Sequence, residues 1–300
     1  MRFRGLGTAL VTPWKDDGAL DEAALERFVD FQIDGGVNFL VPCGTTGENP
    51  AMTEKEHARV VELVIKRADG RVPVLAGAGS NSTQKAIDLA LMVADFGADG
   101  ILTITPYYNK PTPDGLRRHF GMQSEAMEKH RGSGVPMIMY NVPGRTGVNM
   151  TAATTLQIAK EVKNVAGVKE ASANMEQILE ILCERDDDFA VLSGDDAWTL
   201  ALIAAGADGL VSVASNEIPK LMSELVTSAL SGDFAAARTI QNRVLPLLTG
   251  NFIESNPGPV KAVMKMMRIL ENDIVRPPLA PVTAATRTRL EAILKECEVT

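Results

Sequence analysis

Short apolar runs alternate with amphipathic stretches along the first two thirds of the chain, and this alternation constrains the fold more than any other feature. Eight runs have the length of a strand and are mostly apolar: 6–11, 37–43, 72–78, 100–105, 135–141, 165–170, 189–194 and 208–213. Apolar residues also recur at helical spacing in four of the stretches between them, which are 21–32, 53–68, 82–96 and 174–184. Continuous apolar strands that alternate with helices indicate a parallel sheet covered on both faces.

Capping residues mark where several of these helices begin. Asp21, Thr53 and Ser82 are candidate N-caps, and Thr53 with Glu56 fits a capping box. Eight strand–helix units favour a closed TIM (β/α)8 barrel over an open sheet. No G-x-G-x-x-G turn follows the first strand, which argues against a dinucleotide-binding fold.

The strand pattern stops after residue 216, and the rest of the chain is expected to be helical. The expected helices are 218–230, 233–249, 257–270 and 284–297, with the stiff segment RPPLAPV at 276–282. The first closes the barrel and the others form a C-terminal helical appendage. We therefore predict two parts: a catalytic (β/α)8 barrel over 1–230 and a C-terminal helical domain over 231–300.

Composition narrows the class of partner. The 300 residues are 45% apolar and 23% charged with a net charge of −8, which fits a globular protein and argues against a nucleic-acid binder. Three widely spaced cysteines, Cys43, Cys183 and Cys297, form neither a metal motif nor a disulfide framework. The beginning of the chain does not resemble a signal peptide, and no window reaches the ~18 apolar residues of a membrane span. A cytoplasmic location is therefore expected.

In a (β/α) barrel the chemistry lies at the carboxyl ends of the strands, and the residues there are distinctive. The successive ends read GTTGE (44–48), TPYYN (105–109), YNVPGRT (140–146), a strand bearing Lys169, and SGDD (193–196). A lysine held among apolar residues loses solvation, which favours the neutral amine, and a neutral amine can form a Schiff base with a carbonyl compound. Tyr140 is the right type of group to carry protons, and the hydroxyls and N–H groups of Thr45 and Thr46 suit a carboxylate.

Each of these features, taken alone, also fits a structural role. Lys169 could extend to solvent from a strand end, and GTTGE could be an ordinary turn. One of Tyr107 and Tyr108 could be a packing aromatic, and Arg145 could be a solvated loop charge. The three histidines, His57, His119 and His130, show no metal spacing.

Together, the motifs resemble the 4-hydroxy-tetrahydrodipicolinate (dihydrodipicolinate) synthase family. The resemblance is carried by GTTGE, TPYYNKP, YNVPGRT and GVKEAS in this order, and it extends from GTALVTPW (7–14) to NPGPVKAVM (256–264) and the RPPLAPV segment. GTTGE and the lysine strand are shared across the wider pyruvate-dependent class I aldolase superfamily. The double tyrosine and YNVPGRT are more specific to the synthase.

The resemblance implies a lyase of lysine and diaminopimelate biosynthesis that condenses pyruvate with L-aspartate 4-semialdehyde. Lys169 would form the Schiff base, Tyr140 would relay protons, and Thr46 would link Tyr140 to Tyr108 of a neighbouring subunit. Thr45 and Thr46 would bind the pyruvate carboxylate and Arg145 that of the semialdehyde, while backbone carbonyls near Gly194 and Val211 would line the pocket. No metal or organic cofactor is implied, and the expected assembly is a homotetramer, a dimer of dimers.

Two residues depart from the pattern of lysine-inhibited members. Glu54 stands where they carry a histidine or another suitable side chain, and Lys85 stands where they carry an acid, although Asn81 and His57 match. Because Lys85 would repel the ammonium group of a bound lysine, we expect weak or absent feedback inhibition.

Three other functions fit parts of the pattern. Another pyruvate-dependent aldolase or hydratase-aldolase would keep Lys169 and GTTGE but use a different acceptor, and the arginine of YNVPGRT argues against the sugar-acid enzymes. A keto-acid sensor would not need the full set of Lys169, Tyr140, Thr46 and Tyr108. A phosphate-binding barrel isomerase would need a glycine-rich turn after strands 7 and 8, where this chain has SGDD and SVASN.

Overall fold

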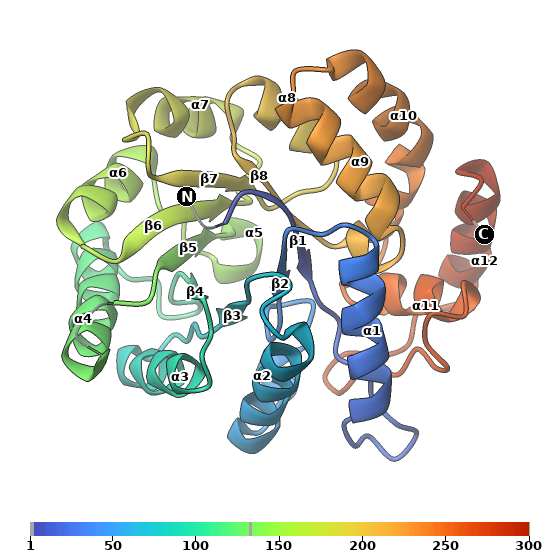
Figure 1. Cartoon of the computed structure of the whole chain (residues 1–300), viewed down its shortest axis with the longest axis horizontal. Helices are drawn as coiled ribbons and strands as arrows, with labels where there is room; N and C mark the ends of the chain where they lie inside the picture. Colours follow the sequence, from blue (N-terminus) through green and yellow to red (C-terminus); the bar gives the residue numbers. More distant parts are fainter. Residues whose placement is uncertain (1–2, 132–133, 300) are drawn as a thin grey trace.

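The computed structural model describes residues 3–131 and 134–299 and shows the predicted TIM barrel (Figure 1). Eight parallel strands lie in the order β2-β1-β8-β7-β6-β5-β4-β3. Two backbone hydrogen bonds, Leu40 N–H to Pro73 O and Gly77 N–H to Pro42 O, join β2 to β3 and bring the sheet almost to closure. The strands are β1 (Gly5–Ala9), β2 (Phe39–Val41), β3 (Leu75–Gly77), β4 (Gly100–Ile104), β5 (Met137–Asn141), β6 (Val165–Glu170), β7 (Ala190–Ser193) and β8 (Gly209–Ser212).

Helices surround the strands, and their caps follow the sequence. Asp21, Thr53 and Ser82 each accept a hydrogen bond from the first turn of a helix, and Thr53 with Glu56 forms a complete capping box, as predicted. Around the barrel run α1 (Glu22–Asp34), α2 (Glu54–Ala68), α3 (Thr83–Asp95), α4 (Pro113–Arg131), α6 (Ala152–Glu161), α7 (Met175–Glu184), α8 (Thr199–Ala204) and α9 (Pro219–Leu230). Short helical turns lie between them: η1 (Asn49–Ala51), α5 (Pro143–Thr146) and η2 (Ala214–Asn216).

The apolar core has two parts. The larger part lies between the strands and the surrounding helices, and a smaller cluster fills the inside of the barrel. At the amino end of the strands, the rings of Phe3 and Phe39 meet edge to face with their centroids 5.5 Å apart. Gly7 and Gly100 make room for these rings, because a Cβ would stand 2.1 Å from Phe39 and 2.4 Å from Phe3. Aromatic packing thus fills the amino end of the barrel.

Three helices follow the barrel and lie beside α8, α9 and α1 in Figure 1: α10 (Phe234–Gly250), α11 (Gly258–Met266) and α12 (Ala284–Glu296). They agree with the expected helices except that α11 ends at Met266, not at residue 270. The strands β2 and β3 are also shorter than the apolar runs that predict them, because those runs continue into the loops. α10 packs on α8 and α9, and the division after residue 230 stays a prediction. Within the described part of the chain, no helix is long and apolar enough to cross a membrane.

Candidate active site

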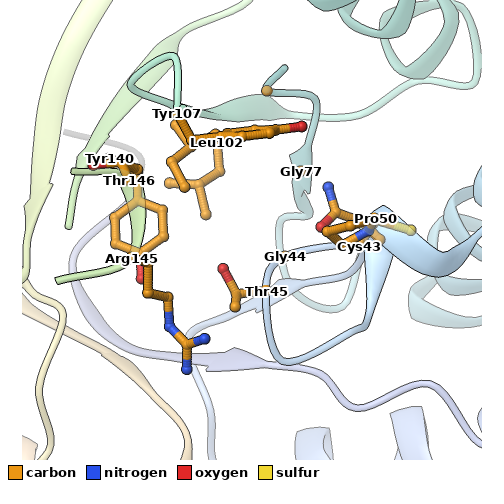
Figure 2. Close-up of a pocket in the computed structure, with 13 residues that line it drawn as sticks. Cys43, Gly44, Thr45, Pro50, Gly77, Leu102, Tyr107, Tyr140, Arg145 and Thr146 are labelled. Atoms are coloured by element: carbon orange, nitrogen blue, oxygen red, sulfur yellow. The ribbon is translucent and has the colours of Figure 1, made fainter. Parts of the chain in front are cut away.

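Two adjoining hollows open at the carboxyl end of the strands and contain most of the predicted site residues. The larger, of about 210 Å³, is bordered by Cys43, Pro50, Tyr107 and Thr146 among others (Figure 2). The smaller, of about 30 Å³, lies deeper and is bordered by Thr46, Lys169, Gly194 and Asn256. Both share a wall made by Gly44, Thr45, Leu102, Tyr140 and Arg145.

Lys169 lies inside the barrel beside Tyr140. The two residues are register partners on β6 and β5, so their side chains leave the sheet on the same face. The Nζ atom stands 4.2 Å from the centroid of the Tyr140 ring, and both side chains are buried, with 6% of each residue exposed. Lys169 therefore does not extend to solvent, and its amine faces the deeper hollow.

Glu170 follows Lys169 on β6, and a glutamate facing the barrel interior would contradict the role predicted for Lys169. Its buried carboxylate accepts hydrogen bonds from Asn141 Nδ2, the Ser172 backbone N–H and Gln177 Nε2 on α7. Burial raises the pKa of the Glu170 carboxyl, and these three donors oppose the rise. Glu170 thus faces the surrounding helices, on the opposite side of β6 from Lys169.

The GTTGE turn carries the two threonines between β2 and η1. Thr45 is partly exposed in both hollows, whereas Thr46 is buried and accepts a hydrogen bond of 2.9 Å from Asn256 Nδ2. Glu48 ends the turn in a left-handed conformation with φ 60°, and its carboxylate is buried against Trp14 and Lys261. The segments NPGPVK and GTTGE contain Asn256, Lys261 and Glu48, but no local pattern marks these three as site residues.

Arg145 and the two tyrosines differ in where they lie. Arg145 is exposed on α5 and borders both hollows, and Figure 2 shows its side chain reaching toward Thr45. Tyr107 is half-buried and borders the outer hollow. Tyr108 is 88% exposed with φ 74°, so within one chain it takes no part in the cavity. Of the pair, Tyr107 is the tyrosine that the chain places in its own site.

The last two predicted residues lie on and near β7 and β8. Gly194 borders the deeper hollow, where a Cβ would stand 3.2 Å from Lys169 Cε, so a side chain there would crowd the lysine. Val211 is packed in the interior cluster and does not border the hollow; Val213, two residues further on, does. The expectation concerns backbone carbonyls near Val211, and their role in lining the pocket stays a prediction.

The histidines and acids nearby have structural partners. His57 Nε2 lies 2.8 Å from Gly77 O, and burial lowers the pKa of its ring. Asp196 accepts hydrogen bonds from Ser212 Oγ and from the Val213 backbone N–H, which ties the SGDD turn to the end of β8. The described residues contain no group of histidine, cysteine or acidic side chains arranged to hold a metal ion.

A larger hollow of about 1020 Å³ lies elsewhere, between the ends of α6 and α7 and the beginning of β6 and β7. Its charged lining is a mixture of lysines and acids, among them Lys160, Glu161, Lys163 and Asp186. Chemistry in this fold lies at the other end of the strands. The lysine hollow is therefore the candidate active site.

Fold and site together are those of a lysine-bearing (β/α)8 barrel, the architecture of enzymes that form a Schiff base with a keto acid. The chain belongs to the dihydrodipicolinate synthetase family, whose family model matches residues 2–297.

Individual relatives agree with this assignment over nearly their whole length. A 4-hydroxy-tetrahydrodipicolinate synthase of Koribacter versatilis is 50% identical, with 100% of this chain and 97% of the relative covered. The crystal structure of dihydrodipicolinate synthase from Thermotoga maritima superposes with a TM-score of 0.95 at 42% identity, covering 100% of both chains. That of the enzyme from Acinetobacter baumannii, complexed with pyruvate, gives 0.94 at 39% identity and covers 99% of both.

Proposed function

We propose that the protein is a lyase that condenses pyruvate with L-aspartate 4-semialdehyde to 4-hydroxy-tetrahydrodipicolinate, in the biosynthesis of diaminopimelate and lysine. One observation carries the proposal: the buried amine of Lys169 lies 4.2 Å from the Tyr140 ring, in a hollow bordered by Thr45, Thr46 and Arg145. This arrangement joins a nucleophile, a proton carrier, hydroxyl donors and a cation for a second carboxylate. Relatives of this protein are named as the same synthase.

The first half of the reaction needs only pyruvate. The Lys169 amine adds to the C2 carbonyl of pyruvate, and the carbinolamine loses water to give an iminium. Tyr140, beside the amine, is placed to move the protons that this addition and dehydration require. Thr45 and Thr46 are placed to hold the pyruvate carboxylate. Loss of a proton from C3 then gives an enamine, with the iminium nitrogen accepting the electron pair.

The second half of the reaction forms the new carbon–carbon bond and then closes the ring. The enamine carbon attacks the aldehyde of the semialdehyde, whose carboxylate pairs with the guanidinium of Arg145 at the mouth of the hollow. The amino group of the same substrate then adds to the iminium carbon. This addition closes the ring as a geminal diamine, and a proton passes from the incoming nitrogen to the Lys169 nitrogen. The C–N bond to Lys169 then breaks, which releases the free amine and leaves an imine in the ring.

Oligomeric assembly is a further part of the proposal. An exposed Tyr108 with a strained backbone is suited to enter the site of a second copy, where it would meet Thr46 and Tyr140. A homotetramer built as a dimer of dimers provides such a contact. A cytoplasmic location, expected from three cysteines that are all free, is proposed with it and can be checked by cell fractionation.

The test uses the purified protein with both substrates, coupled to NADPH oxidation by the next enzyme of the pathway. We expect turnover by the parent and none by Lys169→Ala, whose folding is checked by its circular dichroism spectrum. Borohydride should attach pyruvate covalently to the parent and leave the variant unlabelled. A well-folded parent that is labelled by pyruvate but does not consume the semialdehyde would point to another acceptor, as in the related aldolases. A parent that is not labelled would refute the Schiff base.

A further inference from the structure

The GTTGE turn is held by residues that follow it by more than two hundred positions. Asn256 Nδ2 donates to Thr46 Oγ1 at 2.9 Å, Lys261 Nζ to Glu48 Oε1 at 2.5 Å, and the Arg276 backbone N–H to Glu48 Oε2 at 2.7 Å. All three donors lie in the C-terminal segment around α11. The turn that carries the two threonines therefore has its position set partly from outside the barrel.

The contact with Thr46 has a chemical consequence. A threonine hydroxyl has one proton to donate and two lone pairs that accept hydrogen bonds. Because the amide of Asn256 donates, Thr46 Oγ1 is the acceptor, and its own proton is free for another partner. Thr46 borders the deeper hollow together with Tyr140 and Lys169, so the free proton is available on the side where the proposed chemistry occurs.

The segment that carries Asn256 is anchored to the barrel by buried contacts. Asn256 is 5% exposed and lies two residues before Gly258, where α11 begins. Lys261, on the second turn of α11, is buried against Glu48 and also donates to Ile274 O at 2.8 Å. Arg276 packs on the Trp14 ring with its guanidinium carbon 3.8 Å from the ring centroid, and it pairs with Glu56. The ion pairs fix α11 against the GTTGE turn, and the amide of Asn256 is thereby presented to Thr46.

We propose that Asn256 is a positioning residue that keeps the Thr46 hydroxyl as an acceptor and so directs its proton toward Tyr140 and the bound keto acid. The proposal rests on the proposed function for the identity of the reaction. It adds a residue of the C-terminal segment to the relay and gives that segment a role in the chemistry.

The decisive variant is Asn256→Asp, because it keeps the shape and reverses the hydrogen bond. An ionised carboxylate can only accept, so Thr46 must donate to it and loses the proton meant for Tyr140. We expect the rate of pyruvate attachment to Lys169, followed by borohydride trapping, to fall at least tenfold. The ratio of variant to parent rate should rise as the pH falls from about 8 to about 6, because a protonated carboxyl can again donate.

A double variant separates this role from a general effect on structure. In a Thr46→Val background no hydroxyl remains to be directed, so adding Asn256→Asp should change the trapping rate by less than about twofold. Equal losses in both backgrounds, or a rate ratio that does not change with pH, would overturn the proposal. Trapping needs no semialdehyde, so a wrong acceptor assignment would leave this test intact.

Two more variants complete the design. Asn272→Asp is the matched control: Asn272 lies in the same segment and donates to Trp14 O at 3.0 Å, without touching Thr46 or the hollow, and trapping should stay within about twofold of the parent. If Asn256→Asp does not fold, Asn256→Ala removes the donor without adding charge. It should slow trapping at least tenfold with a pH-independent ratio, and trapping at the parent rate would overturn the proposal.

Discussion

At the scale of single residues, neighbouring positions on one strand serve opposite purposes. Lys169 and Glu170 are adjacent on β6, and because successive side chains of a strand alternate, one enters the barrel and the other meets α7. The lysine lies in a hollow with Tyr140, whereas the glutamate has three donors and no access to the hollow. A strand with period two can thus place the proposed nucleophile and a structural acid side by side in sequence.

The first prediction concerns Arg145, for which we propose a bidentate contact with the semialdehyde carboxylate. Arg145→Lys keeps the charge but loses the planar fork. We expect the KM for the semialdehyde to rise about tenfold to a hundredfold, since hydrogen bonds to charged groups contribute about 1.5–3 kcal/mol. Borohydride trapping of pyruvate should stay within about twofold of the parent.

The control is Arg117→Lys on α4, where the arginine is exposed and pairs with Asp114 away from the site. It should leave both KM values unchanged. An equal rise in the KM for both substrates of Arg145→Lys would show that Arg145 does not select the second substrate.

At the scale of elements, buried ion pairs and hydrogen bonds link segments that are distant in sequence. Lys261 of α11 pairs with Glu48 after β2, and Asp196 after β7 accepts from the residues at the end of β8. Loops at the carboxyl end of a barrel are not held together by the backbone hydrogen bonds that join the strands. These contacts therefore fix their relative positions.

The second prediction tests the link between α11 and the GTTGE turn. Lys261→Met leaves the Glu48 carboxylate buried without its cation, which should lower the free energy of unfolding by about 3–5 kcal/mol. Adding Glu48→Gln should restore part of the loss, because no buried charge is then uncompensated. Urea denaturation measures all three variants. Lys265→Met, which breaks the partly exposed pair with Asp273, should cost less than about 1 kcal/mol; equal losses for the two lysines would contradict the assignment.

The third prediction concerns pH and Asp196. Burial raises the pKa of this carboxyl to about 6 from a usual 3.8. The unfolded chain therefore releases this proton near pH 4 and the folded chain near pH 6. The free energy of unfolding consequently decreases as the pH rises from about 4 to about 6. A pKa difference of about two units corresponds to a loss of about 3 kcal/mol in the free energy of unfolding.

Asp196→Asn removes this titration. Denaturation midpoints at several pH values should show the parent losing stability relative to the variant from about pH 4 to about pH 6, and no further change above. Parallel profiles for the two proteins would mean that Asp196 does not titrate in this range.

At the scale of the whole molecule, one chain lacks a complete site if Tyr108 belongs to the relay. Tyr108 is 88% exposed and Tyr107 is the tyrosine that borders the outer hollow, so the relay proposed above needs a second copy. The strained φ of Tyr108 fits a residue that is held for function.

The fourth prediction is complementation between two inactive subunits. Lys169→Ala and Tyr108→Phe should each have low activity alone, but a mixed dimer contains one site with both Lys169 and Tyr108 intact. Random reassembly of equal amounts should restore about one quarter of the parent activity, because half the dimers are mixed and each has one intact site. Activity assays after co-refolding, with the oligomer size from ultracentrifugation, test this; a mixture no better than its parts would place Tyr108 outside the neighbouring site.

The fifth prediction concerns regulation by lysine. Glu54 and Lys85 are both exposed near the beginnings of α2 and α3, and Lys85 places a positive charge there. We expect the enzyme to keep more than half its activity at saturating substrates in sub-millimolar L-lysine. A fall by half or more would show that these two residues do not prevent inhibition.

The sequence by itself determined the features that depend on local pattern. Eight apolar runs specified the strands, capping residues specified where helices begin, and alternation along β6 placed Lys169 and Glu170 on opposite faces. The carboxyl ends of these strands converge in any such barrel, so Thr45, Thr46, Tyr140 and Arg145 could be grouped before the fold was known.

Only the tertiary structure decided which distant residues support that group. Asn256 meets Thr46 across 210 positions and Lys261 meets Glu48 across 213, and no local periodicity encodes such pairs. The structure also turned Tyr108 outward while Tyr107 turned inward. Which of two adjacent tyrosines faces a cavity depends on the backbone of a loop, and that backbone is set by the packing around it.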